Sequence, residues 1–325
     1  MYSINNNRVG IIDKIYTGYG FYNVYLPMDL KQLRYFHEIV RLGSFTRAAE
    51  SLYVAQPAVS IAIRKLEAEL ELTLFHRHDR KVTLTDEGQR LLPHAQRILQ
   101  TFHDAQLEMQ ELKGLNRGEV RVGIPGMLGS YYFPPILMAF RHRYPHLNLI
   151  VLEGGTWQLQ QMLEAGELDL AVIVRDFVPP EVEARTFLRE EMRVIVARDH
   201  PLASKSSISL QEFFQEELVM FRPGYFHRKI IDQLAHEAGV NPNIGFETNL
   251  LPLIKSIIKQ GFGISTLLTM VVKEDTDLVD LPFTQPLWLD LCIAWRRDGY
   301  LSCANRAFVE FVLEQSPKQM QHRQL

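Results

Sequence analysis

Three basic side chains gather in a chain that is slightly acidic overall, with a net charge of −3 from 35 Lys+Arg and 38 Asp+Glu. Arg77, Arg80 and Lys81 oppose only Asp79, so this short segment carries three positive charges against one negative charge. Guanidinium and ammonium groups concentrated in this way predict contact with a nucleic-acid backbone. Two histidines alternate in the same segment, but no third ligand lies nearby, so we expect no metal site.

The elements around this basic segment predict a helix-turn-helix with a wing. Apolar residues at spacings of three and four predict three helices, and the second carries small alanines that allow close packing. Pro57 fits the first turn of the third helix, where its missing N–H costs nothing. Two short β segments flank the basic tip between residues 74 and 84, as in a wing. Residues 28–86 are therefore expected to form one mainly α domain.

A long helix follows, and Thr85 is its predicted N-cap. Its apolar residues repeat at alternating spacings of four and three, which is the pattern of a coiled-coil seam: Leu91, Ala95, Ile98, Phe102, Ala105, Met109 and Leu112. An apolar stripe on a lone helix needs a partner, and we expect a second copy of the chain rather than the rest of the same chain. Residues 87–117 therefore predict a dimerisation helix followed by a polar hinge.

Residues 118–325 alternate predicted strands and helices, which indicates an α/β domain with a mostly parallel sheet. Its early glycines do not match the Gly-x-Gly-x-x-Gly pattern, which argues against a dinucleotide site. The total length of 325 residues fits about two domains. A hydrophobic content of 46% excludes wholesale disorder, and no run approaches the ~18 apolar residues of a membrane span.

The N-terminal segment and the cysteines carry little chemistry. Residues 1–27 lack the basic start and apolar core of a signal peptide, and we expect a functionally silent extension. Cys292 and Cys303 are too few for a disulfide framework or a four-cysteine zinc site. We expect them to be reduced cysteines of a cytoplasmic protein, although a redox role stays open, and we expect no cofactor.

The N-terminal motifs resemble the winged helix-turn-helix of LysR-type transcriptional regulators. The similarity runs from Met28 to about Leu99, and its ordered motifs are residues 43–52, 56–60, 66–67 and 84–88. Shorter pieces resemble the family's effector domain, at residues 121–124, 153–155, 164–172, 200–202 and 261–264. The resemblance implies an effector domain of two α/β lobes, like a type 2 periplasmic binding protein, with a ligand between them. It also implies a homodimer through residues 91–112, commonly assembled into a tetramer.

The resemblance places the contacts with double-stranded DNA on the third helix and the wing: Gln56, Pro57, Ala58, Ser60, Arg64, Arg77 and Arg80. A glutamine amide pairs best with adenine, and an arginine binds guanine or a phosphate. The chain departs from the family at Ile61, where polar or basic residues are usual. We expect Ile61 to touch a thymine methyl group. Ala55 also departs, because it cannot cap the third helix.

The candidate effector-binding residues follow predicted strands or begin predicted helices: Met127, Ser130, Thr156, Phe221, Arg222 and Asn249. This choice rests partly on the family's use of such loops. Free N–H groups at helix starts favour an anion, and a guanidinium fork suits a carboxylate. The apolar members favour an organic ligand. The sequence therefore predicts a small organic anion, with plain helix capping as the alternative role of Ser130 and Thr156.

These features together predict a ligand-responsive, sequence-specific DNA-binding transcriptional regulator in the cytoplasm. The alternative is a solute-binding receptor or small-molecule-binding protein without a DNA function, which the α/β half alone would allow. Residues 28–112 argue against that alternative. An enzyme is not expected, because the chain lacks the Gly-x-Ser-x-Gly, His-Glu-x-x-His and phosphate-loop motifs.

Overall fold

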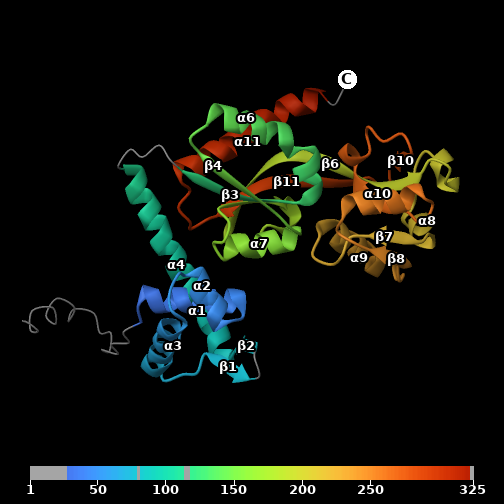
Figure 1. The fold of residues 1–325 in the computed structure, drawn as a ribbon. Coiled ribbons are helices and arrows are strands. Elements are labelled where there is room, and N and C mark those ends of the chain that lie inside the picture. The colour runs from blue at the N-terminus through green and yellow to red at the C-terminus, as the bar shows by residue number, and fades with distance from the viewer. Residues whose placement is uncertain (1–27, 79–80, 113–117, 323–325) are drawn as a thin grey trace, which may run out of the picture. The chain divides into compact units, whose positions relative to one another are not determined.

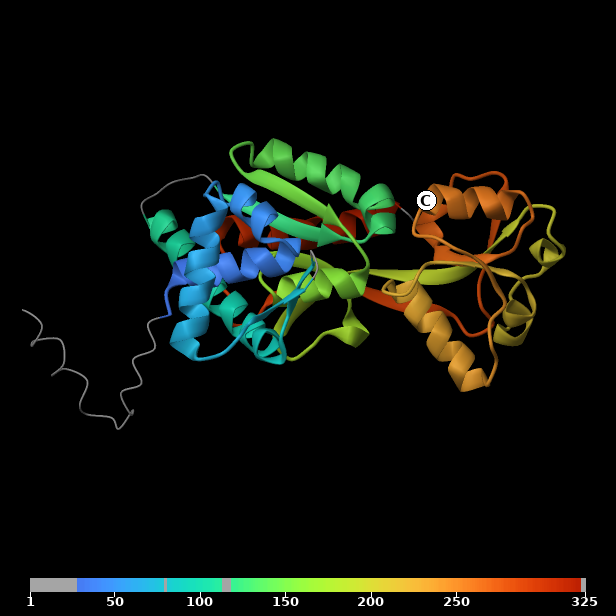
Figure 2. The ribbon, with the colours of Figure 1, turned by 60° about the horizontal axis from the view of Figure 1, so that its bottom comes forward.

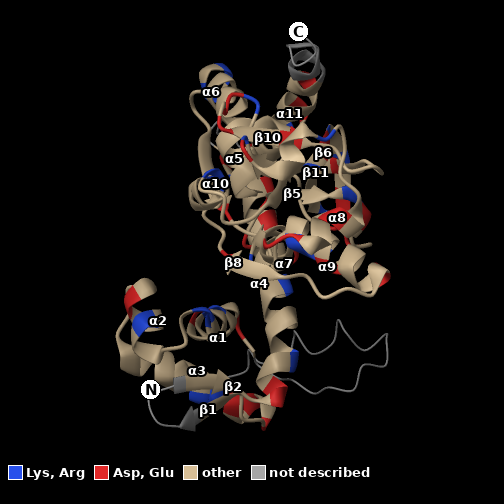
Figure 3. Cartoon of the chain, turned by 90° about the vertical axis from the view of Figure 1, so that its right-hand side faces the viewer, with Lys and Arg blue, Asp and Glu red and all other residues tan. Residues whose placement is uncertain are grey.

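The structure is a computed structural model that describes residues 28–78, 81–112 and 118–322. The chain divides into two compact units, Met1–Ala95 and Gln96–Leu325. The predicted extension at residues 1–27 and Arg80 at the wing tip lie outside the described residues. Positive and negative residues are interspersed in both units, so any positive surface is local (Figure 3).

The first unit contains the three predicted helices and the wing (Figure 1): α1 (Leu30–Leu42), α2 (Phe45–Ser51), α3 (Gln56–Leu70), β1 (Phe75–His78) and β2 (Lys81–Leu84). Local capping signals bound these helices. Gly43 ends α1 in the left-handed region at φ 62°. Ser44 caps α2 by accepting a hydrogen bond from the backbone N–H of Arg47.

The core of the first unit lies between α1, α3 and the wing. Its fully buried side chains recur at helical spacing: Phe36, Ile39, Val59, Ile63 and Leu66. β1 and β2 pair antiparallel, which confirms the predicted wing. The Phe75 ring of β1 lies 5.3 Å from the Phe36 ring and 5.6 Å from the Phe45 ring, centroid to centroid. These contacts fix the wing against the helices.

The long helix α4 spans Asp86–Leu112 and belongs to both units. Thr85 caps it as predicted, because its Oγ1 accepts a hydrogen bond from the N–H of Gly88 at 3.0 Å. The same hydroxyl donates to the carbonyl of Thr73 at 2.6 Å. The start of α4 is thereby tied to the chain that leads into the wing.

The second unit is built on a seven-stranded sheet in the order β10-β6-β11-β5-β3-β4, with β9 also pairing β6. Its strands are β3 (Glu119–Ile124), β4 (Asn148–Glu153), β5 (Leu170–Val174), β6 (Val182–Ala197), β9 (Ser265–Leu268), β10 (Leu278–Leu281) and β11 (Leu287–Arg296). A separate parallel pair joins β7 (Leu218–Met220) to β8 (Ile244–Glu247). The buried residues of these strands form the main core of the unit.

The prediction of a mostly parallel sheet is wrong. Among the described strand pairs of the seven-stranded sheet, only β3–β4 and β3–β5 run parallel, and every pair that includes β6 or β11 is antiparallel. The reason is that two long strands cross between two lobes, as Figure 2 shows. One end of β6 pairs with β11 beside β5 in the first lobe, and its other end pairs with β9 and β10 in the second.

The helices of the second unit divide between the lobes (Figure 1). The first lobe carries α5 (Gly126–Tyr131), α6 (Phe133–Arg143), α7 (Thr156–Glu164) and α11 (Cys303–His322), with the short 3₁₀ helix η2 (Arg175–Phe177). The second carries α8 (Leu210–Gln215), α9 (Phe226–Ala238) and α10 (Leu251–Lys259), with η3 (Pro201–Ser204) and η4 (Thr269–Val271). Among the described helices, none combines the length and apolar composition that a membrane crossing requires.

Candidate functional site

The helix α3 has one buried face and one exposed polar face. Val59, Ile63 and Leu66 are inaccessible to solvent, whereas Gln56, Pro57, Ala58 and Arg64 are exposed. The Gln56 amide donates a hydrogen bond to Ser60 Oγ at 2.9 Å, so these two side chains form one polar pair. The exposed face can thus present amide, hydroxyl and guanidinium groups together to a partner.

Ile61 interrupts this polar face with an apolar side chain. It is 63% exposed, which is far from the burial that isoleucine usually finds in a core. Ala55 precedes α3 without a side-chain cap, as the sequence predicts, so the first N–H groups of α3 receive none from it. Arg77 lies on β1 of the wing. The exposed face of α3 and the basic wing are the two predicted contact surfaces.

The apolar seam of α4 is exposed over its C-terminal half. Ala95 is buried and Leu91 is half-buried, but Ile98, Phe102, Met109 and Leu112 are exposed, with Leu112 at 75%. Exposed apolar side chains in a row at heptad spacing mark an association surface. The seam therefore has no cover from the rest of the described chain at these positions.

A cavity of about 410 Å³ lies between the two lobes of the second unit. The first lobe contributes Thr156, Trp157, Gln160 and Phe177, and the second contributes residues of the loop before α9 and of its first turns. Two hydrogen bonds cross the lobes beside it. The N–H of Trp157 donates to the carbonyl of Gly224 at 3.3 Å, and the Tyr225 hydroxyl donates to Glu153 Oε1 at 3.1 Å.

Lys229 supplies the cavity with a cation. Its ammonium lies 3.8 Å from the centroid of the Phe177 ring and 5.9 Å from that of Trp157, both on the opposite lobe. Within the described chain it has no carboxylate at ion-pair distance. The buried Thr156 Oγ1 likewise finds no hydrogen-bond partner among the described residues. Lys229 and Thr156 thus line a cavity that also contains four aromatic side chains and the ion pair of Arg228 with Asp232.

The structure brings the six predicted effector residues together only in part. Thr156 is the first residue of α7, as predicted, and lines the cavity between the lobes. Phe221 is buried behind that cavity, and its ring stacks on Tyr225 at 5.5 Å between centroids. The backbone N–H of Arg222 donates to Asn249 Oδ1 at 3.0 Å, so that amide oxygen is already used. Arg222 and Asn249 are adjacent, but neither lines the cavity.

Two predicted helix starts are wrong. Ser130 lies at the end of the six-residue α5, because the chain makes an extra helix before α6. It lines a different groove, of about 1000 Å³, between α5, α10 and the crossing strands. Asn249 precedes the N-cap of α10, which is Leu250. Met127 is buried in the core under α5.

Sequence reasoning missed Lys229, Trp157, Phe177 and Tyr225. The available signal was the Pro223-Gly224 turn, which ends directly before a helix start, as at many loops that hold ligands. Next to it, His227 is completely buried and neither ring nitrogen has a hydrogen-bond partner in the described chain. Burial lowers the pKa of His227 to about 3, so its ring stays neutral and packs as an aromatic group.

The comparisons with known proteins match both units of the chain. Residues 30–89 match the model described as bacterial regulatory helix-turn-helix protein, lysR family. Residues 113–317 match the model of the LysR substrate binding domain. The chain belongs to the LysR family of transcriptional regulators. The regulator interpretation made from the sequence is thereby confirmed over that of a receptor without a DNA function, and two α/β lobes are the fold expected of this family.

Relatives of this LysR-family chain are similar over nearly their whole length. The uncharacterized HTH-type transcriptional regulator YwbI of Bacillus subtilis is 35% identical over 87% of this chain and 95% of its own. The RuBisCO operon transcriptional regulator of Allochromatium vinosum is 33% identical over 90% of this chain and 98% of its own. A full-length OxyR variant from Pseudomonas aeruginosa has a TM-score of 0.69 at 26% identity, covering 88% of this chain and 94% of that one.

Proposed function

We propose that this LysR-family regulator is a cytoplasmic protein without catalytic activity that binds double-stranded DNA and a small organic anion. In this proposal residues 28–86 form the DNA-binding domain, residues 87–117 the linker and dimerisation helix, and residues 118–325 the effector-binding domain. The observation that carries the effector assignment is that Lys229 and Thr156 line one cavity while, among the described residues, the Lys229 ammonium has no carboxylate partner and the Thr156 hydroxyl no hydrogen-bond partner.

The proposed DNA contacts are the exposed side chains of α3 together with the wing. The Gln56 amide already donates a hydrogen bond to Ser60 Oγ, so the two side chains are preorganised to contact a base edge together. Arg64 serves a guanine or a phosphate, and Ile61 a thymine methyl group. The basic side chains Arg77 and Arg80 of the wing hold phosphates by charge, which positions the domain without reading sequence.

The proposed dimer forms on the exposed part of the α4 seam. Two copies that pair Ile98, Phe102 and Met109 against each other remove these side chains from water, at about 25 cal/mol per Å² of apolar surface. A dimer of this kind carries two α3 helices, which can read two half-sites of one operator. Assembly of two dimers into a tetramer is part of the same proposal, by analogy with the family.

The chemistry of the cavity favours an organic anion. An ammonium held on two aromatic rings is available to a ligand, because no carboxylate of the described chain pairs with it. Thr156 adds a hydroxyl at the positive end of α7. The rings of Trp157, Phe177 and Tyr225 supply the apolar surface that an organic ligand buries. A carboxylate on a small apolar body satisfies all of these groups.

The test uses the purified full chain and a panel of aromatic and aliphatic carboxylates, each measured beside its uncharged amide. A carboxylate at 100 times its dissociation constant should stabilise the protein by about 2.7 kcal/mol, seen as a raised melting temperature. Lys229→Met should abolish this rise, and Lys229→Arg should keep most of it. Amides that stabilise as well as their acids would refute the anion, and tight carboxylate binding by Lys229→Met would refute the site.

A further inference from the structure

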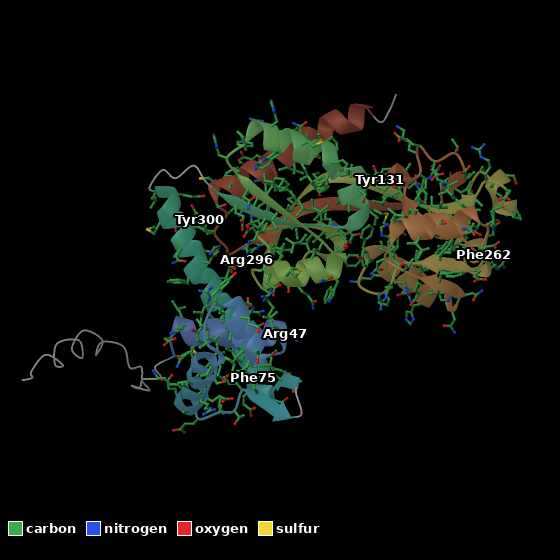
Figure 4. All side chains as sticks on the ribbon, viewed as in Figure 1. Arg47, Phe75, Tyr131, Phe262, Arg296 and Tyr300 are labelled. Atoms are coloured by element: carbon green, nitrogen blue, oxygen red, sulfur yellow. The ribbon has the colours of Figure 1, made fainter. Side chains whose placement is uncertain are left out.

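Two carboxylates of α4 are held by the chain that connects β11 to α11. Asp104 Oδ2 accepts hydrogen bonds from Arg296 Nη2 at 3.2 Å and from the backbone N–H of Tyr300 at 3.3 Å. About two turns further along the helix, Glu111 accepts hydrogen bonds from the Tyr300 hydroxyl at 2.5 Å and from the backbone N–H of Cys303 at 2.8 Å. Figure 4 shows Arg296 and Tyr300 reaching toward α4.

These carboxylates lie on a separate face of α4 from the apolar seam. Gln100, Asp104, Leu107 and Glu111 follow at spacings of four, three and four, and we call them the docking face. At about 100° per residue this row points almost opposite to the seam of Ile98, Phe102 and Met109. The helix can therefore hold its own effector unit with one face while the other face remains free for a second copy.

The docking face fits closely and is shielded from solvent. The side chains of Arg296 and Asp104 are 22% and 14% exposed, so their ion pair is protected better than an ordinary surface pair. Gln100 donates to Asp104 Oδ1 at 2.8 Å and thereby orients the carboxylate. It also lies against Gly166, where a Cβ would meet the Gln100 side-chain oxygen at 2.3 Å. Gly166 adopts φ +76°, so a side chain there would be disfavoured twice.

The contact also has a stable protonation state. The hydrogen bond to Glu111 is the first cause that raises the pKa of Tyr300, to about 12, and burial adds to it. The phenol therefore keeps its proton and continues to donate throughout the physiological range. The carboxylates of Asp104 and Glu111 accept hydrogen bonds, and the Arg296 guanidinium, the Tyr300 hydroxyl and two backbone N–H groups donate them. Each donor of the contact therefore has an acceptor.

The strand that leads into this contact runs between the two lobes. Arg296 is the last residue of β11, and it pairs with Val182 at the first-lobe end of β6. At the other end, Leu287 pairs with Met192, which also pairs with β9 of the second lobe. A change in the angle between the lobes must bend or twist this strand pair, and the end of β11 is where α4 is attached.

We propose that the contacts Asp104–Arg296 and Glu111–Tyr300 are a clamp through which the effector unit sets the direction of the linker helix. The four side chains are positioning residues, since they touch neither the DNA nor the cavity. The inference depends on the proposed function only in taking a change of lobe angle as the signal. A rearrangement of the lobes reaches α4 through β11, and α4 continues into the DNA-binding unit.

The test measures spin-label distances between Arg97→Cys on α4 and Glu183→Cys on β6 by electron paramagnetic resonance. The full chain carries Cys303→Ser so that only the new cysteines react, since Cys292 is buried, and labelled chains are diluted with unlabelled ones. The clamped protein should give a narrow distance distribution. Asp104→Asn with Glu111→Gln should lose it, whereas Glu108→Gln, an exposed carboxylate of the same helix, should keep it.

Two further variants separate a clamp from general loss of structure. The charge exchange Asp104→Arg with Arg296→Asp should restore part of the narrow distribution that either single change loses. Tyr225→Phe removes a hydrogen bond between the lobes, so it should shift the distance in the clamped protein but not in the Asp104→Asn, Glu111→Gln protein. An unchanged distribution without the two carboxylates, or an equal shift in both backgrounds, overturns the clamp. The Lys229 variants test the cavity separately, so failure of one proposal is distinguishable from failure of the other.

Discussion

The hydroxyl of Tyr225, in the second lobe, donates a 3.1 Å hydrogen bond to Glu153 Oε1, at the end of β4 in the first lobe. Burial, followed by the charge and hydrogen bond of Glu153, raises the pKa of Tyr225 to about 12. The phenol therefore stays protonated, and this bond holds the lobes together beside the candidate cavity at any physiological pH.

Tyr225→Phe should loosen the two lobes without unfolding the chain. The lost hydrogen bond is partly exposed to solvent, so its net worth is about 1 kcal/mol, or roughly 2–4 °C in melting temperature. Differential scanning calorimetry measures the shift. Tyr131→Phe is the matched control, because the Tyr131 ring is exposed and, among the described residues, its hydroxyl makes no hydrogen bond between the lobes. An equal fall in melting temperature for both variants would contradict the assignment of this stability to the hydrogen bond between Tyr225 and Glu153.

Arg64→Ala should weaken DNA binding and reduce its dependence on salt. If Arg64 holds a phosphate, the slope of log affinity against log salt should fall by about one unit. Fluorescence anisotropy over a salt series checks both effects. Lys65→Ala is the control, since Lys65 is already paired with Glu69 at 3.5 Å on the same helix. Identical affinities for Arg64→Ala and wild type at each salt concentration would exclude this contact.

Ile61 should contribute through a thymine methyl group rather than through charge. Replacing thymine by uracil throughout the operator should lower the affinity of the wild-type protein. The same replacement should cost an Ile61→Ala protein much less, because the methyl group has lost its partner. A gel-shift comparison of the four combinations measures the coupling, and equal losses in both proteins would count against it.

Ile98→Asp with Phe102→Asp should break the oligomer. Both side chains are exposed on the seam, and two aspartates there would bring like charges into an apolar interface. Multi-angle light scattering should then report the monomer mass. His103→Asp adds a charge to an exposed position of α4 away from the seam and should leave the mass unchanged. A native mass in the double variant would show that the main interface lies elsewhere.

His227 should make the effector unit sensitive to acid. Its folded pKa, about 3, lies below the ordinary 6.5, so the unfolded chain takes up the proton first as the pH falls. The stability is complete above pH 6.5 and is lost on the way down toward 3, at about 1.4 kcal/mol per pH unit. Denaturant unfolding of His227→Phe at several pH values should show a slope smaller by about one proton. An unchanged slope would assign the acid sensitivity to other groups.

The first unit could be predicted from the sequence almost residue by residue, because its signals act over a few residues. Gly43 ends one helix, Ser44 starts the next, and Thr85 caps α4, all without help from distant chain. The apolar spacing likewise predicted the buried face of α3. Such local signals agree with the tertiary structure here, which is why the prediction succeeded.

The pairing of the crossing strands could not be predicted, because the partners are distant in the sequence. The first twelve residues of β6 mix charged and apolar side chains. Only its last four residues, 194–197, have the continuous apolar pattern of a buried strand. Its partner β11 lies about a hundred residues further along the chain. The antiparallel centre of the sheet therefore follows from tertiary pairing, which overrides local strand propensity.

The same distinction explains the candidate effector site. Thr156 was predicted because a helix start is visible in a short stretch of sequence. Lys229 was missed because its neighbours, Phe177 and Trp157, belong to the other lobe. Ser130 was wrongly predicted to begin a helix because the short helix α5 precedes α6. Asn249 was wrongly predicted to begin α10 because the helix starts two residues later. Boundaries are set by packing as well as by caps, so errors of this size are expected.

The pairing of β6 with β11 contains an irregularity at Phe187, which is the extra residue between the partners of Leu291 and Cys292. A bulge interrupts the ladder and increases local twist. The Phe187 ring is buried against the rings of Tyr132 and Phe133, so the extra residue is anchored in the first lobe. The strand pair that joins the lobes is therefore most strongly twisted, and most weakly hydrogen-bonded, at Phe187. A change in the angle between the lobes is therefore expected to be a rotation centred near Phe187 rather than a slide along the strands.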